Sequence, residues 1–101
     1  MDQQHVTIGR EDRDELTEFV LRINGERLGY LEYTRSPGGL MRIEYVEVVP
    51  ELRGTGLGRQ LVETAVRFAQ EQQLTVVPIC SYARMVIQRD PALGVATRER
   101  R

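Results

Sequence analysis

The stretch Val46–Gly58, VEVVPELRGTGLG, is the part of the sequence that most clearly indicates the fold. Its apolar first half predicts the end of a strand that stops at Pro50, and Gly54, Gly56 and Gly58 then lead into a helix. Glycine permits positive φ and lets the backbone approach a ligand closely. The amides at a helix N-terminus favour an anion, typically a phosphate. The stretch therefore predicts a phosphate-binding loop at the crossover of a β–loop–α–β unit.

Two common phosphate-binding motifs do not fit this loop. A P-loop requires a lysine, whereas all 14 basic residues of this chain are arginine. The dinucleotide fingerprint requires GxGxxG, and the loop reads GxGxG.

The segment Arg53–Gly58, RGTGLG, instead matches the R/Q-x-x-G-x-G/A signature of the GNAT acetyltransferase superfamily. The resemblance extends from Glu47 to Pro91, and in length the chain is similar to the minimal, single-domain branch of that superfamily.

The resemblance implies a mixed α/β (α+β) fold, a truncated GNAT fold. Its expected order is an antiparallel meander of three to four strands, then a helix, a parallel strand and a short C-terminal helix. The resemblance also implies acetyl-CoA or coenzyme A as cosubstrate, held by loop amides at its pyrophosphate and by two splayed strands at its pantetheine arm. The cofactor-binding residues implied are Val48, Val49, Arg53, Gly54, Thr55, Gly56, Leu57, Gly58, Arg59 and Cys80.

Length and composition favour a single domain over residues 1–101. The net charge of −1 argues against a dedicated nucleic-acid binder. No apolar run approaches the ~20 residues that cross a bilayer, and the polar N-terminus lacks the apolar segment of a signal peptide. The one cysteine cannot form an intrachain disulfide. We therefore expect a cytoplasmic protein, monomer or homodimer, without a membrane or nucleic-acid partner.

Period-two alternation predicts strands in the first half of the chain. They are expected over Leu16–Ile23, Arg27–Thr34 and Leu40–Val49, and Asn24-Gly25 predicts a hairpin between the first two. Residues 1–14 are polar and charged, and they are interpreted as a loose arm or a partly ordered first strand.

The second half of the chain predicts two helices around a strand. Leu57–Gln72 carries an apolar stripe at helical spacing, which indicates core packing. Leu74–Ile79 is expected to run parallel to the third strand, because a helical crossover joins them. Ser81 is expected to cap a helix over Tyr82–Arg89, and residues 92–101 are expected to be loosely ordered.

Acetyl transfer to an amine requires a base that removes a proton. Glu44 and Glu47 of the third strand are the candidates, and the minimal GNAT branch resembles this sequence at Glu47. In a regular strand Glu47 shares a face with Met41, Ile43 and Tyr45, and a carboxylate on a mostly apolar face suits a base near neutral pH. A bulge near the end of the strand would exchange its two faces, so a solvated or ion-paired carboxylate is the alternative interpretation.

The departing thiolate requires a proton donor or another stabilising group. Larger GNAT enzymes usually show N-x-x-A-x-x-x-Y here, with the tyrosine as general acid. Alignment on Ala83 places Cys80 at the asparagine and Ile87 at the tyrosine, so the usual acid is absent. Cys80 and Tyr82 are the nearby replacements, because a helix N-terminus favours a thiolate and Cys80-Ser81-Tyr82 resembles the minimal branch. Cys80 as a small core residue is the alternative.

The leading hypothesis is an N-acetyltransferase with Glu47, Cys80 and Tyr82 as catalytic candidates and no metal. It would act on an unidentified small molecule or protein amine. The alternative is a non-catalytic module that binds CoA or acetyl-CoA, which the missing tyrosine favours. Larger GNAT enzymes add a strand pair after the second helix, so the acceptor groove here is expected to be open or completed by a second copy.

Overall fold

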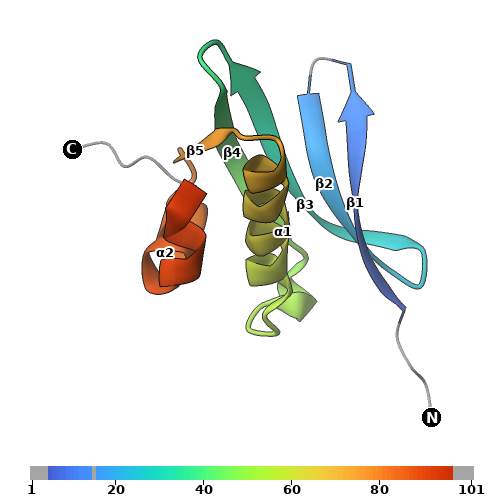
Figure 1. Cartoon of the computed structure of the whole chain (residues 1–101). Helices are drawn as coiled ribbons and strands as arrows, with labels where there is room; N and C mark the ends of the chain where they lie inside the picture. The colour runs from blue at the N-terminus through green and yellow to red at the C-terminus, as the bar shows by residue number, and fades with distance from the viewer. Residues whose placement is uncertain (1–4, 15, 97–101) are drawn as a thin grey trace.

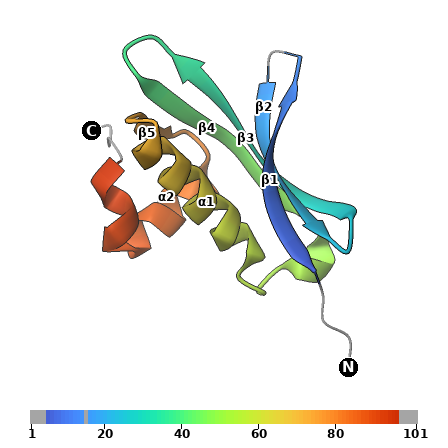
Figure 2. The same ribbon diagram turned by 45° about the vertical axis from the view of Figure 1, so that its right-hand side comes forward.

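The structure is a computed structural model that describes residues 5–14 and 16–96. In this part of the chain, two helices pack on one face of a five-stranded sheet whose strands lie in chain order (Figures 1 and 2). The strands are β1 (Val6–Arg13), β2 (Leu16–Ile23), β3 (Glu26–Ser36), β4 (Leu40–Val48) and β5 (Thr75–Pro78). The helices are α1 (Leu57–Glu71) and α2 (Ser81–Arg89), and two short 3-10 helices are η1 (Pro50–Leu52) and η2 (Pro91–Ala96).

The sheet is an antiparallel meander to which one parallel strand is added. β1 to β4 pair antiparallel, and β5 pairs with β4 in parallel. A parallel neighbour needs a crossover connection, and α1 supplies it. Asn24 and Gly25 turn the chain between β2 and β3 with φ of +52° and +86°, as the hairpin signal predicts. The predicted fold class and order of elements are confirmed.

Both ends of the described chain contain regular structure. β1 fills residues 6–13 of the segment that the sequence left as a loose arm or a first strand, and it pairs along the whole of β2. At the other end, residues 92–96 lie in η2, and Leu93 is 6% exposed within the core. Residues 97–101, which were also expected to be loosely ordered, lie outside the described residues.

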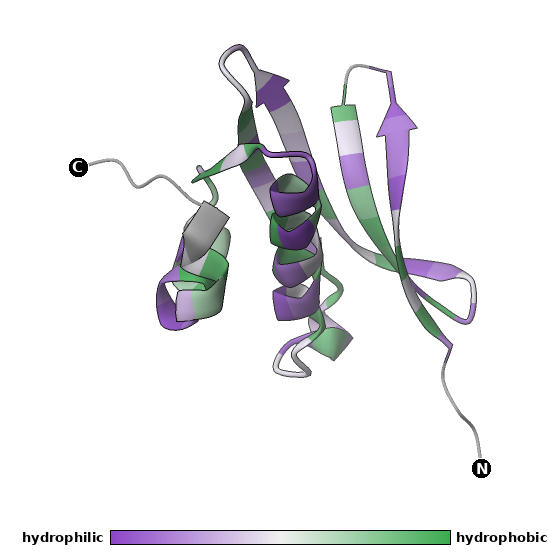
Figure 3. Ribbon diagram, viewed as in Figure 1, coloured by the Kyte–Doolittle hydropathy of each residue, from purple (hydrophilic) through white to green (hydrophobic). Residues whose placement is uncertain are grey.

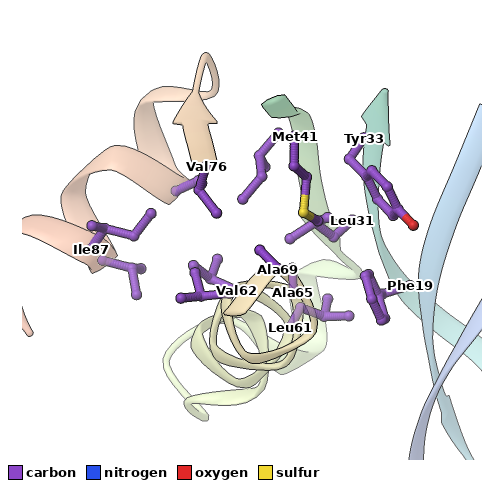
Figure 4. Packing of buried hydrophobic residues seen from close by; sticks show 14 of the residues in the cluster. Phe19, Leu31, Tyr33, Met41, Leu61, Val62, Ala65, Ala69, Val76 and Ile87 are labelled. Carbon is purple, nitrogen blue, oxygen red and sulfur yellow. The ribbon is translucent and has the colours of Figure 1, made fainter. Parts of the chain in front are cut away.

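The core lies between the sheet and the inner side of α1, and α2 closes it at the β5 side (Figure 4). The labelled side chains are Phe19, Leu31, Tyr33, Met41, Leu61, Val62, Ala65, Ala69, Val76 and Ile87. The outer side of α1 is hydrophilic (Figure 3), so the apolar stripe of this helix is used for packing. Burying one large aliphatic side chain contributes about 1.5–3 kcal/mol, and this cluster holds the strands and helices that surround the glycine loop.

The start of α2 differs from the prediction. Cys80 rather than Ser81 is its N-cap, and no side chain of a described residue caps the helix. The amide of Cys80 still donates to the carbonyl of Ile43 on β4 at 3.0 Å, and its backbone is extended. Because Cys80 remains bonded to the sheet, α2 begins directly after it. Within the described residues, neither helix has the length and apolar character needed to cross a membrane.

Candidate active site

The loop between β4 and α1 exposes backbone amides at a helix N-terminus. Gly54 and Gly56 have φ of +80° and +87°, and Gly56 is the N-cap of α1. This conformation favours glycine, and a Cβ at either position would meet open space. In the part of the chain that the structure describes, the amides of Gly54, Gly56, Gly58 and Arg59 have no hydrogen-bond acceptor. The loop therefore offers unused donors at the positive end of a helix dipole.

Thr55 holds this loop in shape from within. Its amide and its hydroxyl donate to the carbonyl of Leu52 at 3.2 and 2.5 Å, and its Oγ1 accepts from the amide of Leu57 at 3.4 Å. The amide of Arg53 donates to the carbonyl of Pro50 at 3.1 Å. The guanidinium of Arg53 is exposed and has no hydrogen bond or ion pair to any described residue. The loop thus keeps its shape without this side chain, which is available to an anion.

Arg59 differs from Arg53 because its charge is already paired. Its guanidinium lies 3.0 Å from the carboxylate of Glu63, one turn along α1, and 3.7 Å from that of Asp90. An arginine shared by two carboxylates contributes less to neutralising a phosphate than an unpaired one. Of the two arginines that the sequence places at the loop, Arg53 is therefore the better placed.

A bulge in β4 decides which face carries Glu47. Ile43 pairs with Tyr33 of β3 and Tyr45 pairs with Glu32, which leaves Glu44 as the extra residue. The prediction that Glu47 shares a face with Met41 and Ile43 is therefore wrong. Those two residues face the core, whereas Tyr45 and Glu47 lie on the other face and are exposed. The alternative with exchanged faces is the one that the structure shows.

The two candidate carboxylates have different partners. Glu44 is half-buried and accepts from the hydroxyl of Thr34 at 3.1 Å and from Nε of Arg42 at 3.3 Å. Glu47 accepts a bond of 3.2 Å from the hydroxyl of Tyr30, its cross-strand neighbour on β3. Burial and this bond to a carboxylate raise the pKa of Tyr30. Glu47 thus carries no cationic partner within the described residues, and Glu44 does.

The pairing of β4 with β5 ends where a ligand could enter. The last pair is Ile43 with Pro78, and the carbonyl of Ile43 then accepts from the amides of Ile79 and Cys80, both at 3.0 Å. Proline has no N–H to continue a ladder. Residues 44–48 of β4 therefore have no strand on that side in the described part of the chain. Cys80 is half-buried and packs against the core at this point.

Tyr82 lies against the start of α1. A Cβ at Gly58 would lie 2.9 Å from the hydroxyl oxygen of Tyr82, so the absence of a side chain at Gly58 makes room for this ring. Tyr82 is 37% exposed, and the partial burial of its phenol against the start of α1 raises its pKa, whereas the nearby charge of Arg59 opposes that rise. The phenol therefore keeps its proton at neutral pH.

A pocket of about 490 Å³ joins the end of β4, the glycine loop and the start of α2. It is lined by Tyr45, Val46, Glu47, Val48, Leu52, Arg53, Gly54, Gly56, Gly58 and Tyr82. Most of the predicted site residues lie in this wall. Those that do not are Val49, Thr55, Leu57, Arg59 and Cys80. Thr55 lies inside the same loop, whereas Cys80 packs against the core instead of lining the pocket.

Sequence reasoning missed Tyr45, Val46 and Leu52 in the wall and Tyr30 beside Glu47. The position of Tyr30 depends on the register of β3 against β4, which the bulge sets. The alternation of β3 did carry a signal, because Tyr30 falls on the face opposite the buried Leu31. That signal places Tyr30 on the outer face without naming its partner.

Comparison with known proteins bears on this pocket. The sequence signature of the family described as GCN5-related N-acetyl-transferase matches residues 18–95. No curated protein sequence matches the chain. A candidate GCN5-like N-acetyltransferase from Staphylococcus aureus is similar in structure, with a TM-score of 0.68 and 19% identity over 92% of this chain and 90% of that one.

Two longer proteins share the fold over part of their length. A nourseothricin acetyltransferase has a TM-score of 0.58 and 27% identity over 77% of this chain and 50% of its own. A candidate streptothricin acetyltransferase from Bacillus anthracis, in complex with acetyl coenzyme A, has a TM-score of 0.55 and 17% identity over 64% of this chain and 38% of its own. This chain therefore spans half or less of the length of these two relatives.

The family signature covers the parts of the chain that build the pocket. Residues 18–95 include the end of β4, the glycine loop, α1 and the start of α2. The likenesses below 25% identity show the shared fold, which places the same elements in the same order. The chain belongs to the GCN5-related N-acetyltransferase family, a family of acetyltransferases.

Proposed function

We propose that this chain transfers the acetyl group of acetyl-CoA to an amine of a small molecule or a protein. The observation that carries the proposal is the pocket of about 490 Å³, whose wall combines an anion-binding loop, a carboxylate and a tyrosine. Acetyl-CoA, when bound, supplies the activated acetyl group as a thioester. Membership of the family supports this acyl donor.

The glycine loop fits the pyrophosphate of coenzyme A. The amides of Gly54, Gly56, Gly58 and Arg59, which have no acceptor among the described residues, are donors at the N-terminus of α1, which attracts phosphate. The open space above Gly54 and Gly56 leaves room for a bulky anion. The guanidinium of Arg53, which pairs with no described residue, adds a positive charge in the same wall. These residues would hold the diphosphate mainly through the backbone.

The open edge of β4 fits the pantetheine arm. Residues 44–48 have β3 on one side and no strand on the other within the described residues. A strand edge presents N–H and C=O groups that pair with another extended chain. Pantetheine carries two amide groups that can form such bonds, and Val46 and Val48 supply apolar contact in the pocket wall.

Glu47 is the proposed base that takes the proton from the acceptor amine. It lies in the pocket wall, is exposed, and accepts a hydrogen bond only from the hydroxyl of Tyr30 among the described residues. Glu44 lies outside the wall, and its carboxylate is occupied by Arg42 and Thr34. A carboxylate held by a cation is a weaker proton acceptor. These contacts favour Glu47 over Glu44.

Tyr82 is the proposed donor of a proton to the departing thiolate. Its phenol is protonated at neutral pH and lines the pocket beside the glycine loop. Cys80 is half-buried and does not line the pocket, which favours a packing role for it. Positioned acid and base groups typically contribute about 10²–10⁴-fold to rate.

Binding of acetyl-CoA by isothermal titration tests the loop. Gly56→Glu should abolish binding, because a carboxylate would occupy the phosphate position. Gly38→Glu is the matched control, since Gly38 has a similar positive φ of +90°, its Cβ also meets open space, and it lies in the turn between β3 and β4. Circular dichroism checks that both variants fold. Equal affinity of both variants and the wild type would place the cofactor elsewhere.

A thiol-release assay with a panel of primary amines tests catalysis. Turnover with at least one amine distinguishes an enzyme from a module that only binds CoA. Glu47→Gln should slow this turnover by about 10²-fold or more while acetyl-CoA affinity stays within a factor of about two. The loss should shrink at high pH, where the amine deprotonates unaided. Glu44→Gln as the only slow variant would make Glu44 the base.

A further inference from the structure

Glu47 lies at the junction of two hollows. It lines the pocket of about 490 Å³ and also a second hollow of about 310 Å³. The second hollow is formed by the start of β3 and the chain after β4, namely Arg27, Leu28, Gly29, Tyr30, Val49 and Pro50, with Val48 and Arg53 common to both. Because the Glu47 side chain is exposed, its carboxylate would move between the two hollows unless another group held it.

Tyr30 is the group that holds this carboxylate within the described residues. Its hydroxyl donates to Oε1 of Glu47 at 3.2 Å. The two residues are direct neighbours across β3 and β4, on the sheet face away from the helices. Directly opposed residues have Cβ atoms about 4.5–5.5 Å apart, so the contact follows from register and needs no change in the backbone.

The ring of Tyr30 is itself held in place. The guanidinium carbon of Arg27 lies 5.2 Å from the centroid of the ring. Two nitrogens of Arg27 donate to the two carboxylate oxygens of Glu18 at 3.1 and 3.2 Å, and Glu18 is 4% exposed. A bidentate pair of this kind has a defined geometry. A chain of contacts therefore runs from a buried carboxylate through Arg27 and Tyr30 to Glu47.

We propose that Tyr30 is a positioning residue for acetyl transfer. Its hydroxyl holds the carboxylate of Glu47 at the junction of the two hollows and so presents it to the acceptor amine. This rests on the proposed role of Glu47 as the base. Tyr30 does not line the pocket of about 490 Å³, so its loss should lower the turnover rate and leave the affinity for acetyl-CoA unchanged.

Tyr30→Phe removes the hydroxyl and keeps the ring on which Arg27 lies. With the amine found by the thiol-release assay, kcat should fall about tenfold, the effect of losing one hydrogen bond to a charged group. The matched control is Tyr33→Phe on the same strand, whose hydroxyl contacts Arg10 on the core face. The control should keep its kcat, and both variants should bind acetyl-CoA as the wild type does.

A double-variant cycle shows whether Tyr30 acts through Glu47. If it does, Tyr30→Phe should have no further effect once Glu47→Gln is present. Two results would overturn the positioning role while the acetyltransferase proposal stands. One is a Tyr30→Phe variant with the kcat of the wild type, and the other is a tenfold loss of kcat when Tyr30→Phe is added to Glu47→Gln. If Glu47→Gln were as fast as the wild type, Glu47 would not be the base, and the positioning role of Tyr30 would be refuted as well. A wild type without turnover on any amine would instead refute the proposed function.

Discussion

Replacing Gly29 with alanine tests how closely β3 and β4 pack beneath the pocket. A Cβ at Gly29 would lie 2.7 Å from Cγ1 of Val48, 3.0 Å from the carbonyl oxygen of Glu47 and 3.2 Å from Cδ2 of Leu21. The end of a side chain can rotate away, but the carbonyl belongs to a paired strand and cannot. Gly29 does not have a positive φ, so the cost of alanine is steric alone.

Overpacking of this kind costs about 1–3 kcal/mol in the free energy of unfolding. Alanine also lowers the conformational entropy of the unfolded chain, which stabilises the folded protein by about 0.4–1 kcal/mol. We therefore expect Gly29→Ala to lose about 1–2 kcal/mol of stability. For a domain of this size that corresponds to a fall in Tm of roughly 5–15 °C.

Thermal and urea unfolding followed by circular dichroism measure this loss. Gly9→Ala is the matched control, because Gly9 is also a strand glycine without positive φ and its Cβ would meet open space. The control should be at least as stable as the wild type, by up to about 1 kcal/mol, because only the restriction of the unfolded chain acts there. A Gly29→Ala protein as stable as the control would refute the argument. Because Val48 and Glu47 line the pocket, Gly29→Ala should also weaken acetyl-CoA binding, and Gly9→Ala should not.

Two further predictions concern tyrosines. Partial burial raises the pKa of Tyr30 and Tyr82 above the ordinary value of 10.0, so the unfolded chain releases these protons at lower pH than the folded chain. Stability should therefore fall as pH rises above about 10, and a urea midpoint that stays level from about pH 8 to about pH 11 would contradict this. Tyr82→Phe should lower kcat by about 10²-fold, and Cys80→Ala by much less. The reverse order would make Cys80 the proton donor.

Local patterns were enough to predict the order of elements. The helix from Leu57, the hairpin at Asn24-Gly25 and the glycine loop each depend on residues close together in the sequence. Spacing at 3.6 or 2 residues and the φ preference of glycine act within a few residues, so a sequence reports them directly. The resemblance to the GNAT superfamily, rather than these patterns, implied that Glu47, Gly56 and Tyr82 belong to one site, and all three line the same pocket.

The face that carries Glu47 was decided only by the tertiary structure. Whether β4 bulges at Glu44 depends on its pairing with β3, and an extra residue in a strand of period two moves every later side chain to the other face. The same register brings Tyr30 to Glu47, and the packing of β2 against β3 brings Arg27, which lies over the Tyr30 ring, to the buried Glu18. Tyr82 lines the pocket and Cys80 does not, and this likewise depends on where β5 stops pairing with β4 and where α2 begins. These features arise from contacts between segments distant in the sequence, whereas periodicity and glycine patterns describe only neighbours along the chain.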